Sequence, residues 1–228
     1  MDQVFQKYTD NYSDTIQRAI RFSGQKHSYF IESKAREICR VTQKYLGQVD
    51  KCTILDVGCG VGLIDKYLSQ KFKKVYGLDM VYAPLKLASE NARNFCCVHY
   101  NGRQMPFAEN TFDVSFAACA FHHSKPEDWQ EIISGMYRVT KPGGLCFIFE
   151  HNPYNPLTIK VVKSLEMDKD ANLLTMTQSK KVLNQGKFKL LEQQFIFFIP
   201  IENKIVQFLE NHLGWCPLGA QYFLVGKK

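Results

Sequence analysis

A short apolar stretch that runs directly into closely spaced glycines sets the strongest limit on how this chain can fold. Residues 53–57, ThrIleLeuAspVal, have the pattern of a buried strand, and glycines follow at 58, 60 and 62 before a helix-like stretch. Glycine allows a sharp turn and the close approach of a ligand that a Cβ atom would exclude. The following helix would offer free N–H groups and the positive end of its dipole. This order predicts the first strand–loop–helix unit of an α/β sheet.

Strand-like and helix-like stretches alternate through the rest of the chain. The expected strands are 53–57, 74–79, a short one around 98, 112–117, 145–150, 188–199 and 220–225, and the expected helices are 62–71, 82–94, 126–139 and 201–213. Residues 141–144, LysProGlyGly, have the composition of a turn. Strands separated by helices predict right-handed crossovers and a parallel sheet with helices on both faces. The two late strands would close one edge of that sheet.

Composition places the chain among ordinary globular proteins and excludes several classes. Its 228 residues indicate one domain, and 45% of them are hydrophobic and 22% charged. No apolar run approaches the ~20 residues of a membrane span, and the amino terminus lacks the apolar core of a signal peptide. The eight cysteines form no CxxC pair and no zinc-ligand spacing, so we expect reduced thiols in a cytoplasmic protein. The net charge of +7 includes no long run of like charge, which favours a solvated surface over a nucleic-acid-binding tail.

Two aspartates give the glycine loop its chemical character. Asp79 ends the second expected strand, 19 residues after Gly60, at the place where an acidic side chain would bind two ribose hydroxyls. Asp56 stands two residues before the first glycine, and the glycine spacing is GxGxG rather than the GxGxxG of dinucleotide sites. A carboxylate there would repel a pyrophosphate and favour a cationic ligand with an amino group and a sulfonium. The alternative is a tight turn without a ligand, which the position of Asp79 disfavours.

The segment IleLeuAspValGlyCysGlyValGly (54–62) resembles the first motif of class I S-adenosylmethionine-dependent methyltransferases. The match continues in MetProPheAlaGluAsnThrPheAspVal (105–114), PheHisHis (121–123) and ArgValThrLysProGlyGlyLeu (138–145). This order and spacing resemble the type-11, UbiE-like branch, over about residues 50–150. The resemblance implies a Rossmann-like, doubly wound, mostly parallel seven-stranded α/β sheet with a C-terminal antiparallel strand and an N-terminal helical cap. It also implies S-adenosylmethionine as the cofactor and S-adenosylhomocysteine as the product.

We expect a single methyltransferase domain over residues 1–228. Within it, residues 1–49 would form a helical, aromatic-rich cap over the open end of the sheet. Residues 50–150 would form the cofactor-binding core, and residues 151–228 the substrate-side cap and the sheet-closing strands.

The resemblance also assigns cofactor contacts, residue by residue. They fall on Asp56, Gly58, Gly60, Gly62, Asp79, Met80, Asn101, Gly102 and Ala117. The three glycines would line the methionine moiety, Asp56 would anchor that moiety through its charge, and Asp79 would take the ribose hydroxyls. Met80 would pack against adenine, and the Ala117 carbonyl would face the amino group. Asn101 stands where the family usually has an aspartate; its side-chain oxygen still accepts a hydrogen bond, so we expect altered affinity rather than lost binding.

Three histidines are the candidate catalytic groups. His122 and His123 follow the fourth strand and His151 follows the fifth, so all three should lie at the sheet edge where ligands bind. Methyl transfer is an in-line displacement that depends mostly on positioning, and a base is needed chiefly when the acceptor is a hydroxyl. Each histidine could act as that base. One alternative is that the histidine pair only caps the strand and shapes the pocket. Glu150 could orient His151 or could be a satisfied carboxylate at the strand end. No cluster of carboxylates calls for a metal, so we expect none.

The most plausible acceptor is a small molecule, namely a sugar, a lipid-linked intermediate or a quinone-type intermediate. A tRNA or protein methyltransferase is the alternative that the basic excess favours and that the lack of an RNA-binding appendage disfavours. A second alternative is a catalytically silent subunit that binds the cofactor for a partner. Aromatic residues near the amino terminus could form a lid over the acceptor or could simply pack in the core: Tyr8, Tyr12, Phe22, Tyr29 and Phe30.

Overall fold

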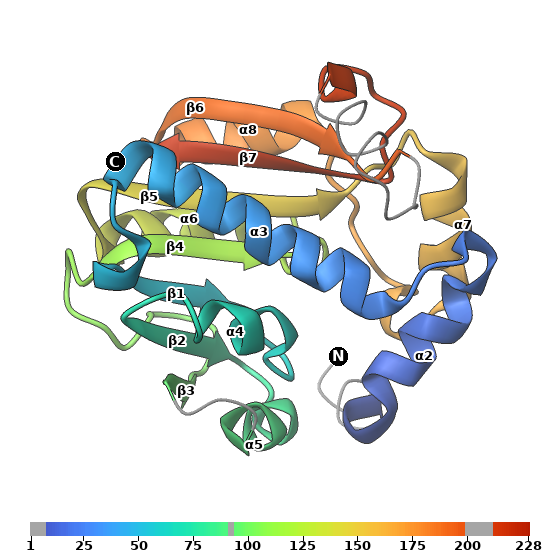
Figure 1. Ribbon diagram of the computed structural model, residues 1–228, viewed down its shortest axis with the longest axis horizontal. Coiled ribbons are helices and arrows are strands. Elements are labelled where there is room, and N and C mark those ends of the chain that lie inside the picture. The colour runs from blue at the N-terminus through green and yellow to red at the C-terminus, as the bar shows by residue number, and fades with distance from the viewer. Residues whose placement is uncertain (1–7, 91–93, 199–211) are drawn as a thin grey trace.

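A seven-stranded sheet runs through the centre of the molecule (Figure 1). The computed structural model describes residues 8–90, 94–198 and 212–228. The strands are β1 (Thr53–Val57), β2 (Lys74–Asp79), β3 (Phe95–His99), β4 (Phe112–Ala118), β5 (Thr140–His151), β6 (Lys189–Ile196) and β7 (Gln221–Lys227). Their order is β3-β2-β1-β4-β5-β7-β6, and only β7 runs antiparallel to its neighbours. The expected fold class is confirmed.

Helices cover both faces of this sheet. The α-helices are α2 (Tyr12–Ala19), α3 (His27–Leu46), α4 (Leu63–Leu68), α5 (Tyr82–Glu90), α6 (Trp129–Val139), α7 (Pro156–Ser164) and α8 (Met176–Gln185). The 3-10 turns are η1 (Thr9–Asn11), η2 (Arg21–Ser23), η3 (Val49–Lys51), η4 (Phe121–His123) and η5 (Glu166–Asp168). Helices α3, α4 and α5 pack into one buried cluster, and α6 and α8 pack into another on the opposite face.

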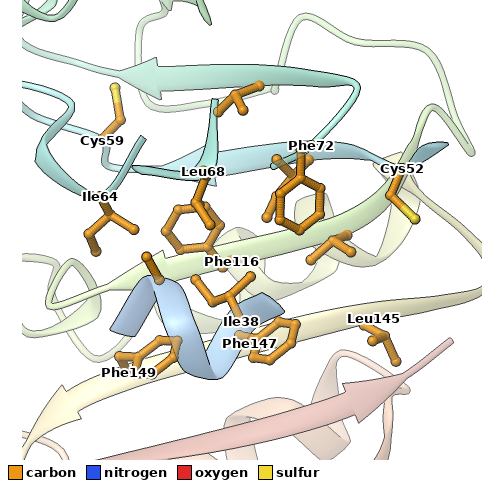
Figure 2. Close-up of a cluster of buried hydrophobic side chains, with 14 of the residues drawn as sticks. Ile38, Cys52, Cys59, Ile64, Leu68, Phe72, Phe116, Leu145, Phe147 and Phe149 are labelled. Carbon is orange, nitrogen blue, oxygen red and sulfur yellow. The ribbon is translucent and has the colours of Figure 1, made fainter. Parts of the chain in front are cut away.

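The central strands are apolar on both sides, as a sheet covered by helices on both faces requires. Along β5, Phe147 and Phe149 enter the cluster beneath α3, whereas Cys146 and Ile148 enter the cluster beneath α6 and α8. Figure 2 shows the first cluster, with Ile38 of α3 beside Phe147. This alternation fixes which strand-end residues can point toward a ligand site.

Helix α3 belongs to the sheet as well as to the cap. The side chains of Ile38 and Val41, in its second half, are fully buried in the first cluster. Arg40 and Lys44 form ion pairs with Glu192 of β6 at 3.0 and 2.6 Å. The helix therefore crosses from the ligand end of the molecule into its core (Figure 1).

Several element boundaries differ from the sequence-based predictions. The turn predicted at residues 141–144 is wrong, because β5 already begins at Thr140. Gly143 has a φ of 79°, and a Cβ on Gly144 would lie 2.7 Å from the carbonyl oxygen of Asp113. The two glycines thus let the strand bulge and shift its register against β4 instead of turning away. Helix α4 is shorter than predicted, and most of the helix predicted at 201–213 lies outside the described residues.

The strand order reverses between β1 and β4, because the chain leaves the β3 edge and returns on the other side of β1. In open α/β sheets such a reversal opens a crevice at the carboxyl ends of the strands. Helices α2 and α7 lie at that end of the sheet (Figure 1). All eight cysteines are free thiols, and none of the described helices is both long and apolar enough to cross a membrane.

Candidate active site

A cavity of about 820 Å³ opens at the carboxyl ends of the central strands. One end is lined by the loops after β1 and β2, and the other by η4, α7, η5 and the helices α2 and α3 that precede the sheet. Of the twelve residues that the sequence assigned to cofactor or catalysis, all but Gly62 line this cavity. The sheet therefore gathers at one place residues that are up to 95 positions apart in the chain, from Asp56 to His151.

The loop after β1 is held open by backbone hydrogen bonds. Gly58, Gly60 and Gly62 have φ values of 81°, 52° and 71°, a region that glycine adopts without strain. The N–H of Gly58 donates to the carbonyl of Leu78 at 2.7 Å. A Cβ on Gly60 would meet no atom within 4 Å, whereas one on Gly62 would lie 3.0 Å from the side chain of Ala88. Gly60 thus borders open space in the cavity, and Gly62 permits the packing of α4 against α5.

Asp79 links the two loops of the cofactor end. Its Oδ2 accepts a hydrogen bond from the N–H of Gly60 at 2.8 Å, and its Oδ1 accepts one from the N–H of Val81 at 2.9 Å. A carboxylate oxygen has more than one lone pair, so each oxygen retains capacity for a ligand donor. The carboxylate therefore holds the glycine loop in place and still faces the cavity.

The far side of this end is formed by the segments that follow β2, β3 and β4. Met80 is 51% exposed, and its side chain covers Gly102, where a Cβ would lie 2.5 Å from the Met80 methyl group. The Oδ1 of Asn101 accepts a hydrogen bond from the N–H of Arg103 at 3.1 Å. Ala117 is buried near the end of β4. These residues and Asp79 line the same part of the cavity.

Asp56 and Asp65 form a buried carboxyl pair under the glycine loop. Asp65 lies in the first turn of α4, and both side chains are almost completely shielded from solvent. In the described structure neither Asp65 oxygen nor the Oδ1 of Asp56 accepts a hydrogen bond from an N–H or hydroxyl group; the two carboxyl groups pair with each other. Burial raises the pKa of Asp65 to about 7, and burial together with the charge of Asp65 raises the pKa of Asp56. The pair therefore binds protons more readily than two exposed carboxyl groups do.

Lys34 of α3 brings a buried positive charge to the middle of the cavity. It is 5% exposed, and its Nζ lies 3.5 Å from the Sγ of Cys119. Cys119 follows β4 with a φ of 55°, which is rare for a residue with a side chain. Burial raises the pKa of this thiol, but the charges of Lys34 and His151 outweigh burial and lower it to about 7. A cation and a partly ionised thiol thus lie between the two ends of the cavity.

Glu150 orients His122, not His151 as the sequence suggested. The Nδ1 of His122 lies 2.6 Å from Glu150 Oε2, and both side chains are about 1% exposed. Glu150 Oε1 accepts a hydrogen bond from the N–H of Phe121 at 2.9 Å. Burial lowers the pKa of His122, but the charges of Glu150 and Asp168 raise it to about 10. The imidazole is therefore held in one orientation in the wall of the cavity.

His123 and His151 are more accessible than His122. The Nε2 of His123 lies 3.6 Å from Asp168 Oδ1, and burial together with the charge of His122 lowers the pKa of His123 to about 3. The His123 imidazole is therefore neutral at physiological pH and is a weak base. His151 has its Nδ1 3.3 Å from the side-chain nitrogen of Gln221.

Some of the aromatic residues near the amino terminus line the cavity, and others pack in the core. Tyr12, Phe22 and Phe30 line the cavity. Tyr29 is buried, and its ring packs against that of Phe30 at 5.2 Å between centroids. The hydroxyl of Tyr8 donates a hydrogen bond to Glu166, which ties the start of the described chain to η5 beside the cavity.

Comparison with known proteins identifies the family. The methyltransferase domain family matches residues 55–148. An uncharacterized methyltransferase of Synechocystis sp. is 32% identical over 144 residues, which cover 61% of this chain and 68% of that protein. The demethylmenaquinone methyltransferase of Geobacillus stearothermophilus is 33% identical over 104 residues, which cover 42% of this chain and 44% of that protein. The chain belongs to the type-11 branch of the class I S-adenosylmethionine-dependent methyltransferases.

Solved structures agree with this methyltransferase in fold. An S-adenosylmethionine-dependent methyltransferase of Thermotoga maritima superimposes over the whole of both chains with a TM-score of 0.68 at 16% identity. A methyltransferase of Haloferax volcanii, solved in complex with the Trm112 activator, superimposes over 98% of this chain and 96% of its own with a TM-score of 0.67 at 15% identity. The match in fold therefore extends beyond residues 55–148 to almost the whole chain.

S-adenosylmethionine is the cofactor of this methyltransferase, and the cavity fits it in chemical character. The open space beside Gly60 is free of side-chain atoms. Three buried oxygens of the carboxyl pair, Asp56 Oδ1 and both of Asp65, lack a hydrogen-bond donor among the described residues, as expected of a group that binds a positively charged ligand. Asp79 offers carboxylate oxygens to a diol.

Sequence reasoning missed Lys34 and Asp168. Lys34 lies three residues after Ile31 and four before Ile38, so it falls on the buried stripe of an amphipathic helix. A lysine in that buried stripe indicates a candidate site residue, because a buried ammonium group needs a partner or a ligand. Asp168 lies in a short 3-10 turn, where hydrophobic periodicity carries no information about burial.

Proposed function

We propose that this methyltransferase transfers a methyl group to a small-molecule acceptor that carries an extended apolar part, as a lipid-linked or quinone-type intermediate does. The observation that carries the proposal is the shape of one cavity: its cofactor end and a largely apolar second end are continuous. Apolar side chains from three helices line the second end, namely Ile16, Ile20, Phe30, Leu157 and Val161. The similarity to the Geobacillus relative, a demethylmenaquinone methyltransferase, supports the same acceptor class. A free sugar would leave this apolar surface without a partner.

At the cofactor end, we propose the following contacts. Asp79 accepts hydrogen bonds from the two ribose hydroxyls, and Gly58 and Gly60 border the methionine moiety. The shared charge of Asp56 and Asp65 draws the positively charged amino group. Lys34, the nearby buried cation, is suited to the carboxylate of the same moiety, so the two ends of an amino acid meet opposite charges.

At the adenine end, Met80 supplies an apolar surface, Asn101 and Gly102 border the base, and the Ala117 carbonyl faces the amino group. The Oδ1 of Asn101 already accepts one hydrogen bond and can accept a second. These assignments follow the positions that the family motifs give to the same residues.

Bound S-adenosylmethionine would supply an electrophilic methyl group, so the protein has mainly to position the acceptor in line with it. The apolar side chains hold the acceptor and exclude water. His123 borders the cavity and is the first candidate to accept a proton from an acceptor hydroxyl, and its lowered pKa makes it a weak base. His122 is fixed by Glu150 and acts as a positioning residue, and His151 is the second candidate for the base.

The cofactor assignment is tested by calorimetric titration of the full chain with S-adenosylmethionine and S-adenosylhomocysteine. We expect Asp79→Ala to weaken both by ~100-fold, because two hydrogen bonds to a charged acceptor contribute ~3 kcal/mol in total. Asp79→Asn removes the charge and keeps one acceptor oxygen, which can serve the N–H of Gly60 or that of Val81 but not both. Asp50→Ala, at an exposed aspartate remote from the cavity, is the matched control. Unchanged affinity in both Asp79 variants would remove the ribose assignment.

The acceptor class is tested by transfer of a labelled methyl group to a hydroquinone with a prenyl tail, to a polyprenyl-linked sugar and to the corresponding free sugar. We expect the tailed acceptors to be preferred, and shortening the tail to raise KM. Phe22→Ser and Leu157→Ser should reduce this preference. Methylation of tRNA with no transfer to any small acceptor would refute the proposal.

A further inference from the structure

We propose that His122, His123 and Asp168 form a binding site for one divalent transition-metal ion at the acceptor end of the cavity. One potential ligand atom of each residue lies within 4.8 Å of the others. Asp168 Oδ1 is 3.8 Å from the Nε2 of His122 and 3.6 Å from the Nε2 of His123. The three residues come from two segments, η4 and η5, that are remote in the chain.

These separations approach those of a metal-ligand set. Ligands at ~2.0–2.2 Å from a zinc ion in a tetrahedral arrangement lie ~3.3–3.5 Å from one another. The distances from Asp168 to the two imidazoles therefore have to shorten by only a few tenths of an ångström.

Glu150 already fixes the orientation of the His122 imidazole. Glu150 Oε2 lies 2.6 Å from the Nδ1 of His122, which leaves Nε2 directed toward Asp168. Histidine ligands of metal ions commonly donate their other ring N–H to a carboxylate in this way. Glu150 is in turn held by the N–H of Phe121 at 2.9 Å, and it lies at the fully buried end of β5. The arrangement thus includes the second layer of contacts that a metal site requires.

The segment that carries Asp168 is tied to the segment that carries the histidines. The N–H of Asn172 donates to the carbonyl of His122 at 2.7 Å, and the N–H of Ala171 donates to the carbonyl of Asp168 at 3.0 Å. These contacts keep the third ligand beside the other two. A helix terminus or a loose loop would not provide this restraint.

Two imidazoles and one carboxylate favour zinc, iron, cobalt or manganese over magnesium and calcium, which prefer oxygen ligands alone. Three protein ligands leave further coordination positions open, and all three residues line the cavity. An oxygen atom of the acceptor is the ligand that such a position would take. This last step rests on the proposed function, whereas the metal site itself does not. In the metal-bound protein His123 Nε2 is a ligand and cannot also be the base.

The test is titration of the full chain, freed of metal by a chelator, with cobalt(II) alone, followed by its visible absorption. We expect one equivalent to bind with a spectrum of nitrogen and oxygen ligation. His123→Ala and Asp168→Asn should each weaken binding by ~100-fold. His212→Ala, which removes an exposed histidine away from the cavity, should leave the affinity unchanged.

Equal cobalt affinity in the wild type and in both variants would overturn the proposal, and so would a thiolate charge-transfer band, because the eight cysteines are the competing ligands. If a variant fails to fold, the wild-type spectrum and stoichiometry still decide. Binding of S-adenosylhomocysteine is measured on the same samples. A chain that binds S-adenosylhomocysteine but not cobalt refutes the metal site alone, and one that binds cobalt but not S-adenosylhomocysteine refutes the cofactor assignment alone.

Discussion

The buried carboxyl pair makes the stability of this methyltransferase depend on pH, and Asp65→Asn should remove much of that dependence. Asp65 has a pKa raised from 3.8 to about 7, first of all by burial. A carboxyl group whose pKa is higher in the folded state favours folding at low pH. That contribution is complete below the pKa of the unfolded chain and is lost as the pH rises through about 7.

The size of the effect follows from the same pKa. A displacement from 3.8 to about 7 corresponds to ~4 kcal/mol in total, and ~2–3 kcal/mol of it falls between pH 5 and pH 8. Asparagine at position 65 stays neutral and can donate a hydrogen bond to Asp56, whose Oδ1 lacks a donor among the described residues. The free energy of unfolding of the variant should therefore be similar to that of the wild type at pH 5. At pH 8 it should be ~2–3 kcal/mol higher than that of the wild type.

Urea unfolding at pH 5, 6, 7 and 8, without ligand and with a chelator present, measures this difference. The fluorescence of Trp129 is a suitable probe, because its indole is buried and donates to the carbonyl of Phe121 at 2.9 Å. Comparing the two pH profiles cancels the titration of the groups remote from position 65, so the difference reports on the pair of Asp56 and Asp65. Parallel profiles, or a variant that is less stable than the wild type at pH 8, would refute the reasoning.

Three further predictions concern two glycines and the thiol of Cys119. Gly77→Ala should destabilise the protein by ~1–3 kcal/mol in urea unfolding, because its Cβ would lie 2.5 Å from the ring of Phe95; an unchanged midpoint would contradict this. Gly60→Ala should lower the free energy of unfolding by ~1 kcal/mol because of the positive φ at this position. It should weaken the binding of S-adenosylhomocysteine in calorimetry far more, because the added Cβ enters the open space of the cavity. Undiminished affinity would show that the cofactor lies elsewhere. Iodoacetamide should alkylate Cys119 with an apparent pKa near 7, and Lys34→Met should slow the reaction at pH 7.5, as peptide mass spectrometry can measure; equal rates would exclude the effect of the lysine charge.

The fold and the cofactor end could be predicted because their determinants are local. The glycine loop, the strand before it and Asp79 are each recognisable within a few residues, and parallel strands bring their carboxyl ends to one edge. For the same reason His122 and His123 could be placed at the cavity from their position after β4.

The remaining contacts depend on register and on segments without a periodic pattern. The pairing of Glu150 with His122 follows from the register of β4 against β5, which hydrophobic pattern alone does not set to a single residue. Asp168 reaches the histidines only because the chain after α7 folds back through η5. The role of Gly62 in helix packing likewise depends on where α5 lies.

Helix α3 also limits how such an enzyme can acquire a new acceptor. Its first half presents Phe30 and Lys34 to the cavity, and its second half anchors Ile38 and Val41 beneath the sheet. An insertion or deletion within the helix would rotate each half against the other and disrupt the core at the same time as the pocket. Divergence of specificity in this lineage should therefore proceed by point substitutions on α3 and by length changes in the segments before and after it, a pattern that directed-evolution libraries can exploit.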